Sequence, residues 1–93
     1  MATLHMDVSV ARSIQKKLET ALTNLEQQLH DASNAVMQLE SGSWQGQSAQ
    51  QFYDKFHTWE NNARRLCEEL RNLTTALRNE ITQWENMAQR LEG

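Results

Sequence analysis

The side chains that could carry out chemistry are few and widely spaced in this 93-residue sequence. Cys67 is the only cysteine, so no disulfide within the chain and no cysteine-based zinc site can form. The pair Glu68-Glu69 falls on what would be the exposed face of a helix, where charge is ordinarily solvated. A glycine-rich phosphate loop and a Gly-x-Ser-x-Gly nucleophile turn are both missing from the sequence. The sequence therefore predicts no catalytic residue, no metal site and no cofactor, and we do not expect an enzyme.

Two of the three histidines form a possible pH-sensitive pair. Folding the chain about Trp44 would place residue i roughly opposite residue 89 − i, so that His30 and His57 could face each other. Two histidines alone do not make a zinc site. Protonation near pH 5 to 6 would bring like charges together, and we expect it to loosen the packing there.

The composition is typical of long helices. Hydrophobic residues make up 39% and charged residues 23%, with three glycines and no proline, so the several turns of a sheet protein are not available. Nine basic against twelve acidic residues, without a basic stripe, argue against a nucleic-acid partner. No segment approaches the roughly 20 apolar residues of a membrane span, and the first residues do not resemble a secretory signal peptide. We expect a chain that is cytosolic or leaves the cell by a route without such a peptide, and no stable membrane insertion.

Apolar residues recur at spacings of three and four over two segments, which predicts two helices, at about 8–40 and about 48–91. A strand would alternate every second residue instead. The predicted core of the hairpin and of its dimer consists of Leu18, Leu22, Leu25, Leu29, Val36, Phe52, Phe56, Trp59, Leu66, Leu70, Leu73 and Leu77.

A single turn at 41–47 separates the two helices. It contains both internal glycines, and Gly42 suits a left-handed cap at the end of the first helix. Ser48 with Gln51 has the form of a capping box that opens the second helix, while Asp7 or Ser9 could cap the first. The predicted fold is all-α, an antiparallel helix-turn-helix hairpin that makes one domain of residues 1–93.

One hairpin buries too little apolar surface to be stable alone. Two antiparallel helices share one narrow contact line, and the backbone entropy cost of about 1 to 2 kcal/mol per residue requires more burial than that line provides. We therefore predict that two hairpins pair into a four-helix bundle.

The central turn carries a recognisable motif, Trp44-Gln45-Gly46. A proline-free, two-helix chain of about a hundred residues with Trp-x-Gly in its turn resembles the WXG family, the early-secreted-antigen-like proteins of type VII secretion systems. The resemblance covers nearly the whole chain. It extends to small and aromatic residues after the turn, namely Ala49, Phe52, Phe56 and Trp59.

The resemblance implies a non-catalytic hairpin that pairs as a homodimer or as a heterodimer with a related WXG-type protein. It also implies export by the type VII machinery, from the cytoplasm to the outside of the cell, without a cleaved signal peptide. In the family, the tryptophan and glycine of the turn help to form a notch beside the end of the partner's helix, and this surface takes part in export. Trp44 and Gly46 are the corresponding residues here.

The export signature of the mycobacterial members, Tyr-x-x-x-Asp or Glu after the second helix, is missing. The only tyrosine is Tyr53, early in the second predicted helix, and the residue four positions after it is His57 in place of an acidic residue. A looser pattern is partly met by Ile81, Glu85 and Ala88. The alternative function is therefore a cytosolic coiled-coil adaptor, or a chaperone partner of a larger secreted toxin that carries the signal.

Overall fold

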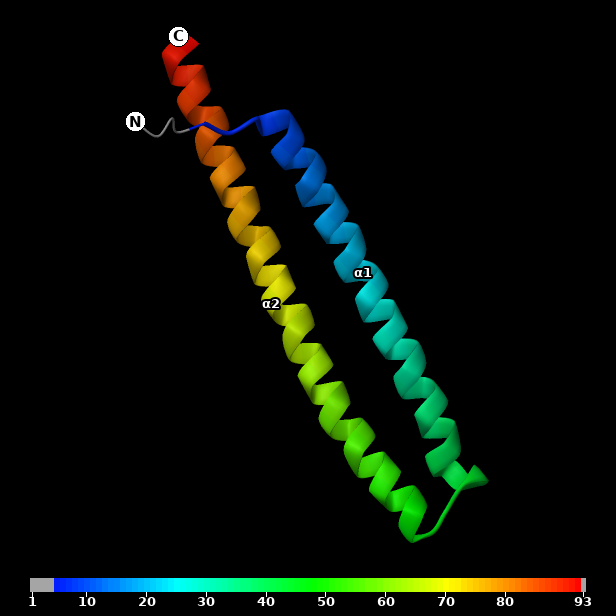
Figure 1. Ribbon diagram of the computed structural model, residues 1–93. Coiled ribbons are helices and arrows are strands. Elements are labelled where there is room, and N and C mark those ends of the chain that lie inside the picture. The colour runs from blue at the N-terminus through cyan, green and yellow to red at the C-terminus, as the bar shows by residue number, and fades with distance from the viewer. Residues whose placement is uncertain (1–4, 93) are drawn as a thin grey trace.

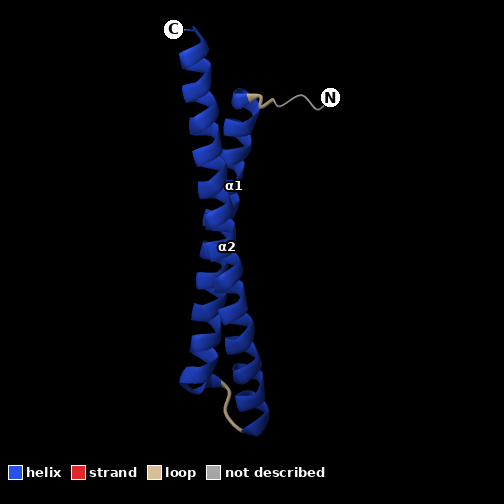
Figure 2. Cartoon of the chain, turned by 90° about the vertical axis from the view of Figure 1, so that its left-hand side faces the viewer, coloured by secondary structure: helices blue, strands red, loops and turns tan. Residues whose placement is uncertain are grey.

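The computed structural model describes residues 5–92, with side chains described through Arg90, and shows a helical hairpin. Helix α1 spans Val8–Gln38, one π-helical turn (η1) spans Leu39–Ser43, and helix α2 spans Gln47–Glu92. The helices run antiparallel and side by side in both views (Figures 1 and 2), in a rod of 69 × 24 × 15 Å. The prediction of an all-α hairpin is confirmed.

The start of each helix is set by one residue. Asp7 caps α1: its Oδ1 accepts a hydrogen bond from the backbone N–H of Val10 at 3.2 Å. At the start of α2, the N–H of Gln50 donates to the carbonyl of Gly46 at 3.0 Å, which makes Gly46 the N-cap. The prediction that Ser48 caps this helix is wrong, because Ser48 already lies inside its first turn.

The end of α1 unwinds into the π-helical turn. The N–H of Trp44 donates to the carbonyl of Leu39, five residues back, at 3.1 Å, and the Ser41 hydroxyl donates to the carbonyl of Gln38 at 2.9 Å. Gly42 follows with a φ of +141°, a left-handed conformation that glycine adopts without steric cost. The predicted left-handed glycine is therefore confirmed, and the chain leaves α1 toward α2 at this point.

The contact between the helices is one narrow stripe. On α1 it follows a single row spaced by seven residues, and on α2 it follows a matching row. The buried residues are Gln15, Leu22, Leu29, Val36, Ala49, Tyr53, Thr74 and Ile81. Two of them, Gln15 and Thr74, carry polar side chains, so the seam of the hairpin is only partly hydrophobic.

Ion pairs along one edge of the stripe fix how the helices align. Each helix contributes a charged residue at intervals of seven. The pairs are Arg12 with Glu85, Glu19 with Arg78 (2.8 Å), and Glu26 with Arg71 (2.5 Å). Exposed pairs contribute at most about 1 kcal/mol each, so they specify the register more than they stabilise the fold. We call this side of the hairpin the polar edge.

The second glycine of the turn offers a test of the turn geometry. Gly46 has a φ of +122°, and a Cβ built there would meet no atom of the described residues within 4 Å. Gly46→Ala should therefore cost only the strain of a left-handed backbone, about 1–2 kcal/mol of the free energy of unfolding. Urea unfolding followed by circular dichroism, at one fixed protein concentration, measures this cost. Ser43→Ala, a neighbouring turn substitution without that strain, should stay within about 0.5 kcal/mol of the wild type.

Candidate protein-interaction site

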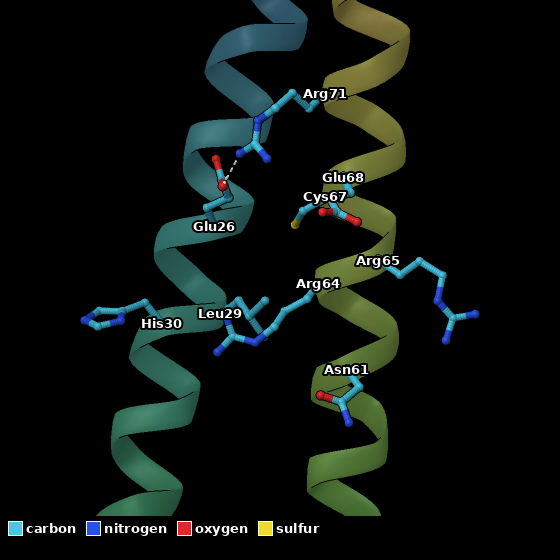
Figure 3. Close-up of a pocket in the computed structure, with 9 residues that line it drawn as sticks. All are labelled: Glu26, Leu29, His30, Asn61, Arg64, Arg65, Cys67, Glu68 and Arg71. Carbon is cyan, nitrogen blue, oxygen red and sulfur yellow. Dashed lines mark hydrogen bonds and ion pairs between the residues drawn. The ribbon is translucent and has the colours of Figure 1, made fainter.

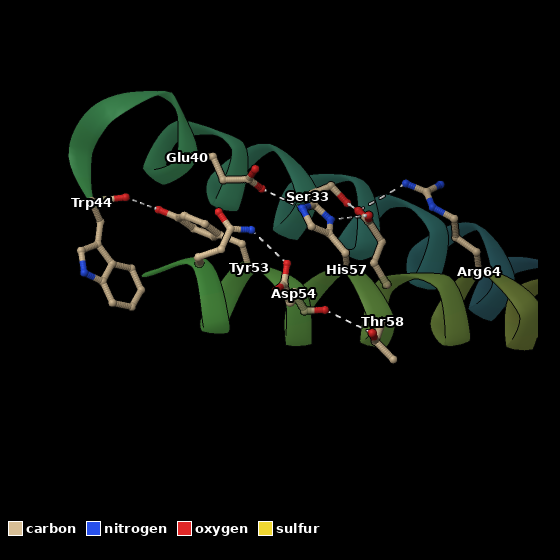
Figure 4. A network of polar contacts seen from close by, with 10 residues as sticks. Ser33, Glu40, Trp44, Tyr53, Asp54, His57, Thr58 and Arg64 are labelled. Carbon is tan, nitrogen blue, oxygen red and sulfur yellow. Dashed lines mark hydrogen bonds and ion pairs between the residues drawn. The ribbon is translucent and has the colours of Figure 1, made fainter. Parts of the chain in front are cut away.

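Trp44 is fixed to the first turns of α2 by its backbone and by its ring. The Tyr53 hydroxyl donates a 2.6 Å hydrogen bond to the Trp44 carbonyl (Figure 4). Burial raises the pKa of Tyr53, and the negative charge of Glu40 raises it further, so the phenol stays protonated and able to donate. The indole packs against Phe52 and Tyr53 with ring centroids 5.5 and 5.8 Å away. It remains 39% exposed, so the ring is both anchored and accessible.

A small pocket opens between the turn and the start of α2. Its volume is about 280 Å³, and its lining consists of Glu40, Trp44, Gln45, Gly46, Ala49, Gln50 and Tyr53. Within the described residues, no atom lies within 4 Å of a Cβ built at Gly46. The two residues that define the Trp-x-Gly motif therefore lie at one accessible pocket, with Glu40 as its single charged lining residue.

His57 joins the turn to α2. Its Nε2 lies 2.9 Å from a carboxylate oxygen of Glu40 (Figure 4). Its Nδ1 lies 3.6 Å from a carboxylate oxygen of Glu60. His30 interacts instead with Asn34, its own helix neighbour, at 3.2 Å. The predicted contact between His30 and His57 is therefore wrong.

The geometry of antiparallel helices explains the difference. Side chains lean toward the N-terminus of their own helix, so α1 side chains lean toward the open end and α2 side chains toward the turn. An edge residue of α1 therefore contacts a residue of α2 whose backbone lies closer to the open end of the hairpin than its own. His57 pairs with Glu40 at the same offset that joins Arg12 to Glu85 and Glu26 to Arg71.

Glu60 lies at the centre of this network and is only 14% exposed. The hydrogen bond from the Ser33 hydroxyl is the main cause that lowers the pKa of Glu60. Partial burial opposes that shift, while His57 and Arg64 reinforce it. A carboxylate in the seam is thus held ionised by partners from both helices.

The side of the hairpin away from the polar edge is apolar and open. A row of α2 residues spaced by seven carries four large side chains with 40 to 66% exposure, namely Phe52, Trp59, Leu66 and Leu73. On α1, Ile14 (43%) and Leu25 (48%) are also exposed. Leu25, Leu29, Trp59, Ala63 and Leu66 line an apolar hollow of about 230 Å³ between the helices, together with Gln28 and Cys67. We call this side the open face.

Aromatic rings connect the turn to the open face. Centroid distances of 5.5 Å from Trp44 to Phe52, 6.5 Å from Phe52 to Phe56, and 5.5 Å from Phe56 to Trp59 describe one continuous ribbon of rings. Such contacts favour offset and tilted pairs, as seen here. A partner that covers the open face would therefore also reach the Trp44 turn.

The polar edge forms a groove of about 600 Å³ around Glu26, Arg64 and Arg71 (Figure 3). The pair between Glu26 and Arg71 crosses it, whereas His30 and Arg65 point away from it. Arg64 and Arg71 each have a carboxylate partner, so their charge is already compensated. This side of the hairpin is consistent with a solvated surface.

The predicted core residues divide into three groups in the hairpin. Leu22, Leu29 and Val36 are buried. The half-buried residues are Leu18, Phe56, Leu70 and Leu77. The exposed ones are Leu25, Phe52, Trp59, Leu66 and Leu73. Helical spacing found the apolar residues, but it did not separate those that join α1 to α2 from those on the open face.

The possible C-terminal export pattern does not form one exposed surface in the hairpin. Ile81 is 0% exposed, and Glu85 is engaged by Arg12. Only Ala88 is exposed. A receptor could not contact Ile81 while the hairpin is closed.

The described part of the chain carries neither a metal-binding cluster nor a membrane-spanning helix. Within residues 5–92, no group of three or more His, Cys, Asp or Glu side chains could hold a metal ion. None of the helices in that range is apolar over a sufficient length to cross a bilayer.

These features define a small helical hairpin with an exposed Trp-x-Gly turn and a continuous apolar face. Residues 3–86 match the family model WXG100, described as proteins of 100 residues with WXG. The chain belongs to the WXG100 family. This family is associated with type VII secretion, and its members pair with related proteins. No curated protein and no solved structure matched the chain.

The network around Glu60 predicts how stability depends on pH. Folding lowers the pKa of Glu60, so the unfolded chain binds the proton first, and the stabilisation is lost as the pH falls below about 4.5. Ser33→Ala should lower the free energy of unfolding by about 0.5–1 kcal/mol at pH 7, and this difference should shrink toward pH 3. Urea unfolding at pH 7, 5 and 3.5 tests it. A difference that is constant across this range would show that the hydrogen bond does not depend on the Glu60 charge.

Proposed function

We propose that this protein is a small non-catalytic WXG-type protein that is exported by, or co-secreted through, a type VII secretion system and acts as a helical dimer. The observation that carries the proposal is the open face of α2. Phe52, Trp59, Leu66 and Leu73 are its largest side chains and stay 40 to 66% exposed in the hairpin. Exposed apolar surface of this extent marks protein contact sites.

The distribution of apolar residues supports a four-helix bundle. The α2 row that faces α1 contains Tyr53, Glu60, Cys67, Thr74 and Ile81, which is a mixed row with little hydrophobic surface at its centre. The neighbouring row holds aromatic and leucine side chains, each of which would contribute roughly 1.5–3 kcal/mol when fully buried. A second hairpin laid on the open face buries this row and leaves both polar edges in water.

We assign the Trp44 turn to the export surface. Trp44 is accessible, Gly46 keeps the pocket beside it open, and both lie at one end of the aromatic ribbon. In a bundle whose hairpins point in opposite directions, this turn lies beside the α2 end of the partner. The proposed route leads from the cytoplasm to the outside of the cell, with the type VII machinery as a further partner and without a cleaved signal peptide.

The alternative function is a cytosolic coiled-coil adaptor, or a chaperone partner of a larger secreted toxin. The burial of Ile81 favours it, because the C-terminal pattern of Ile81, Glu85 and Ala88 is then not exposed for recognition. In this alternative, the open face pairs with a hairpin of the toxin, and the toxin carries the signal.

Trp59 provides the first test, because it is 52% exposed in the hairpin. If nothing covered it, Trp59→Gln would change stability by no more than about 0.5 kcal/mol. In the bundle, it should cost about 2–4 kcal/mol and shift the protein from dimer to monomer at micromolar concentration. Light scattering coupled to size exclusion, with urea unfolding at the same concentration, measures both effects.

Met37→Gln is the matched control for that substitution. Met37 is 62% exposed but lies beside Asn34, Gln38 and Ser41, outside the open face. It should change neither the mass nor the midpoint of unfolding. Equal effects of the two substitutions would contradict the assignment of the open face.

Export is tested in a bacterium that has an active type VII system, with a strain lacking that system as the reference. The protein should reach the culture medium only in the active strain. Trp44→Ala should reduce the exported fraction at least about fivefold, because most of the accessible indole surface is then lost. The variant should still form the dimer. Met37→Ala should be exported normally. Retention of the wild type inside the cell, unless a toxin is co-expressed, would favour the adaptor function instead.

A further inference from the structure

The open end of the hairpin covers part of the C-terminal pattern. Ile81 is 0% exposed on the row of α2 that faces α1, and Glu85, one turn later, is paired with Arg12. Ala88, the third residue of the pattern, is exposed. Spacings of four and three residues place all three on one side of α2. The first turns of α1 therefore determine whether that side is accessible.

The contact that holds α1 over this side contains an unfavourable polar group. Gln15 of α1 and Ile81 of α2 lie between the same two ion pairs of the polar edge, the first two counted from the open end. Gln15 is 6% exposed, and its side-chain oxygen has no hydrogen-bond partner within the described residues. A buried oxygen in this state favours any form of the protein in which water reaches it. Opening of this end therefore relieves one unfavourable feature of the closed form.

The turn end of the hairpin is packed more extensively than the open end. Val36, Ala49 and Tyr53 form a buried apolar cluster, and Phe56 packs against it. On α2, Ile81 is the single buried apolar side chain between Tyr53 and the last side chain that the structure describes. Regions with few buried apolar contacts open locally at a low free energy while the rest of the fold stays intact. The open end is therefore the part of the hairpin that separates most easily.

The start of α1 also has little intrinsic helical stability. Its first turn contains the β-branched residues Val8 and Val10 and no acidic residue, so helix propensity and the helix dipole contribute little there. Two turns that leave the surface of α2 depend on local helix stability alone, and short helical segments are marginal in water. We expect residues 8–15 to detach as one unit, and we call them the latch segment.

We propose that the latch segment gates the C-terminal pattern, so that its detachment from α2 uncovers Ile81 and Glu85 for recognition by the type VII machinery. The inference rests on the proposed export function and adds the regulation of its C-terminal pattern. One movement exposes the apolar and the acidic residue together, because it uncovers Ile81 and separates Arg12 from Glu85. The side of α2 that is hidden in the closed hairpin then becomes a docking surface.

The two isoleucines of the chain report on this movement. Ile81 is fully covered in the closed hairpin, whereas Ile14 is already 43% exposed. With labelled isoleucine methyl groups in the full-length protein, NMR relaxation dispersion should show exchange at Ile81 with an open population of about 1% or more. Backbone amides of residues 11–18 should exchange with solvent at least about tenfold faster than those of residues 29–36. Amide exchange also detects openings that are too slow for dispersion.

Gln15→Leu should hold the latch segment closed. Leucine continues the buried apolar row of α1 and removes the oxygen that has no partner, so the open population and the amide exchange of residues 11–18 should both fall about tenfold. Gln27→Leu is the matched control. Gln27 is exposed, and its side chain donates to the residue four positions later, as that of Gln15 does. This control should change neither quantity by more than about 1.5-fold.

Arg12→Gln and Glu85→Gln remove the same ion pair from opposite sides. Each should increase the open population about three- to fivefold, the upper range for an exposed pair. Arg71→Gln is the control, because it removes the pair with Glu26 in the middle of the polar edge, which stays formed when only the open end separates. Exchange at Ile81 should then change by no more than about 1.5-fold.

The same variants separate exposure of the pattern from its recognition in the export assay. Gln15→Leu should reduce the exported fraction about fivefold or more, because the closed latch segment hides Ile81. Arg12→Gln should be exported at least as well as the wild type. Glu85→Gln opens the same end but lacks the acidic residue, so its export should be lost.

The outcomes distinguish the latch segment from the proposed function. An Ile81 methyl group without exchange, together with slow amide exchange in residues 11–18, would overturn the detachment, while export of the protein would still stand. Normal export of Gln15→Leu, in spite of a lowered open population, would overturn the gating role. Retention of the wild type in the strain with an active system would contradict the proposed function and with it the gating role, whereas exchange at Ile81 would still show the detachment.

Discussion

The narrow contact between α1 and α2 is the constraint on which the other features of this molecule depend. Two antiparallel helices cover one stripe of each other, and here that stripe holds Leu22, Leu29 and Val36 against a row of α2 that includes Thr74. The rings and leucines with the largest burial energy lie one row away. In the proposed bundle, their stabilisation is realised only when a second hairpin covers them, which would couple the stability of the fold to association and to protein concentration.

The polar edge determines which side of the hairpin is left for that surface. Ion pairs at seven-residue intervals hold the helices in one alignment, and His57 with Glu40 extends the same series to the turn. Alignment at the turn matters because Trp44 is attached to α2 through Tyr53 and Phe52. If α1 shifted along α2 by one ion pair, the turn would move relative to the aromatic ribbon. Weak individual pairs can thus position a binding surface without contributing much to stability.

Helical periodicity and glycine chemistry were sufficient to predict the hairpin and the left-handed Gly42, because both depend on local sequence. The pairings across the hairpin were not predictable in the same way. A backbone-level count placed His30 opposite His57, but the lean of side chains along each helix joins His57 to Glu40. Two further features depend on how the helices meet, which the periodicity of the sequence does not specify. They are the helix cap at Gly46 instead of Ser48 and the exposure of Trp59.

The polar residues in the seam help to determine which row of α2 packs against α1 and which row stays on the open face. Gln15 is 6% exposed, and its side-chain oxygen has no hydrogen-bond partner within the described residues, a state that costs about 1–3 kcal/mol. Together with Thr74 and the ionised Glu60, Gln15 reduces the free energy that is gained when α1 and α2 pack against each other in a single hairpin. A fully apolar seam would let α1 and α2 form a self-sufficient pair and would make either face of α2 acceptable as the inner one. Because polar groups mark one row as the seam, the larger side chains stay on the open face, where the proposed bundle places the partner.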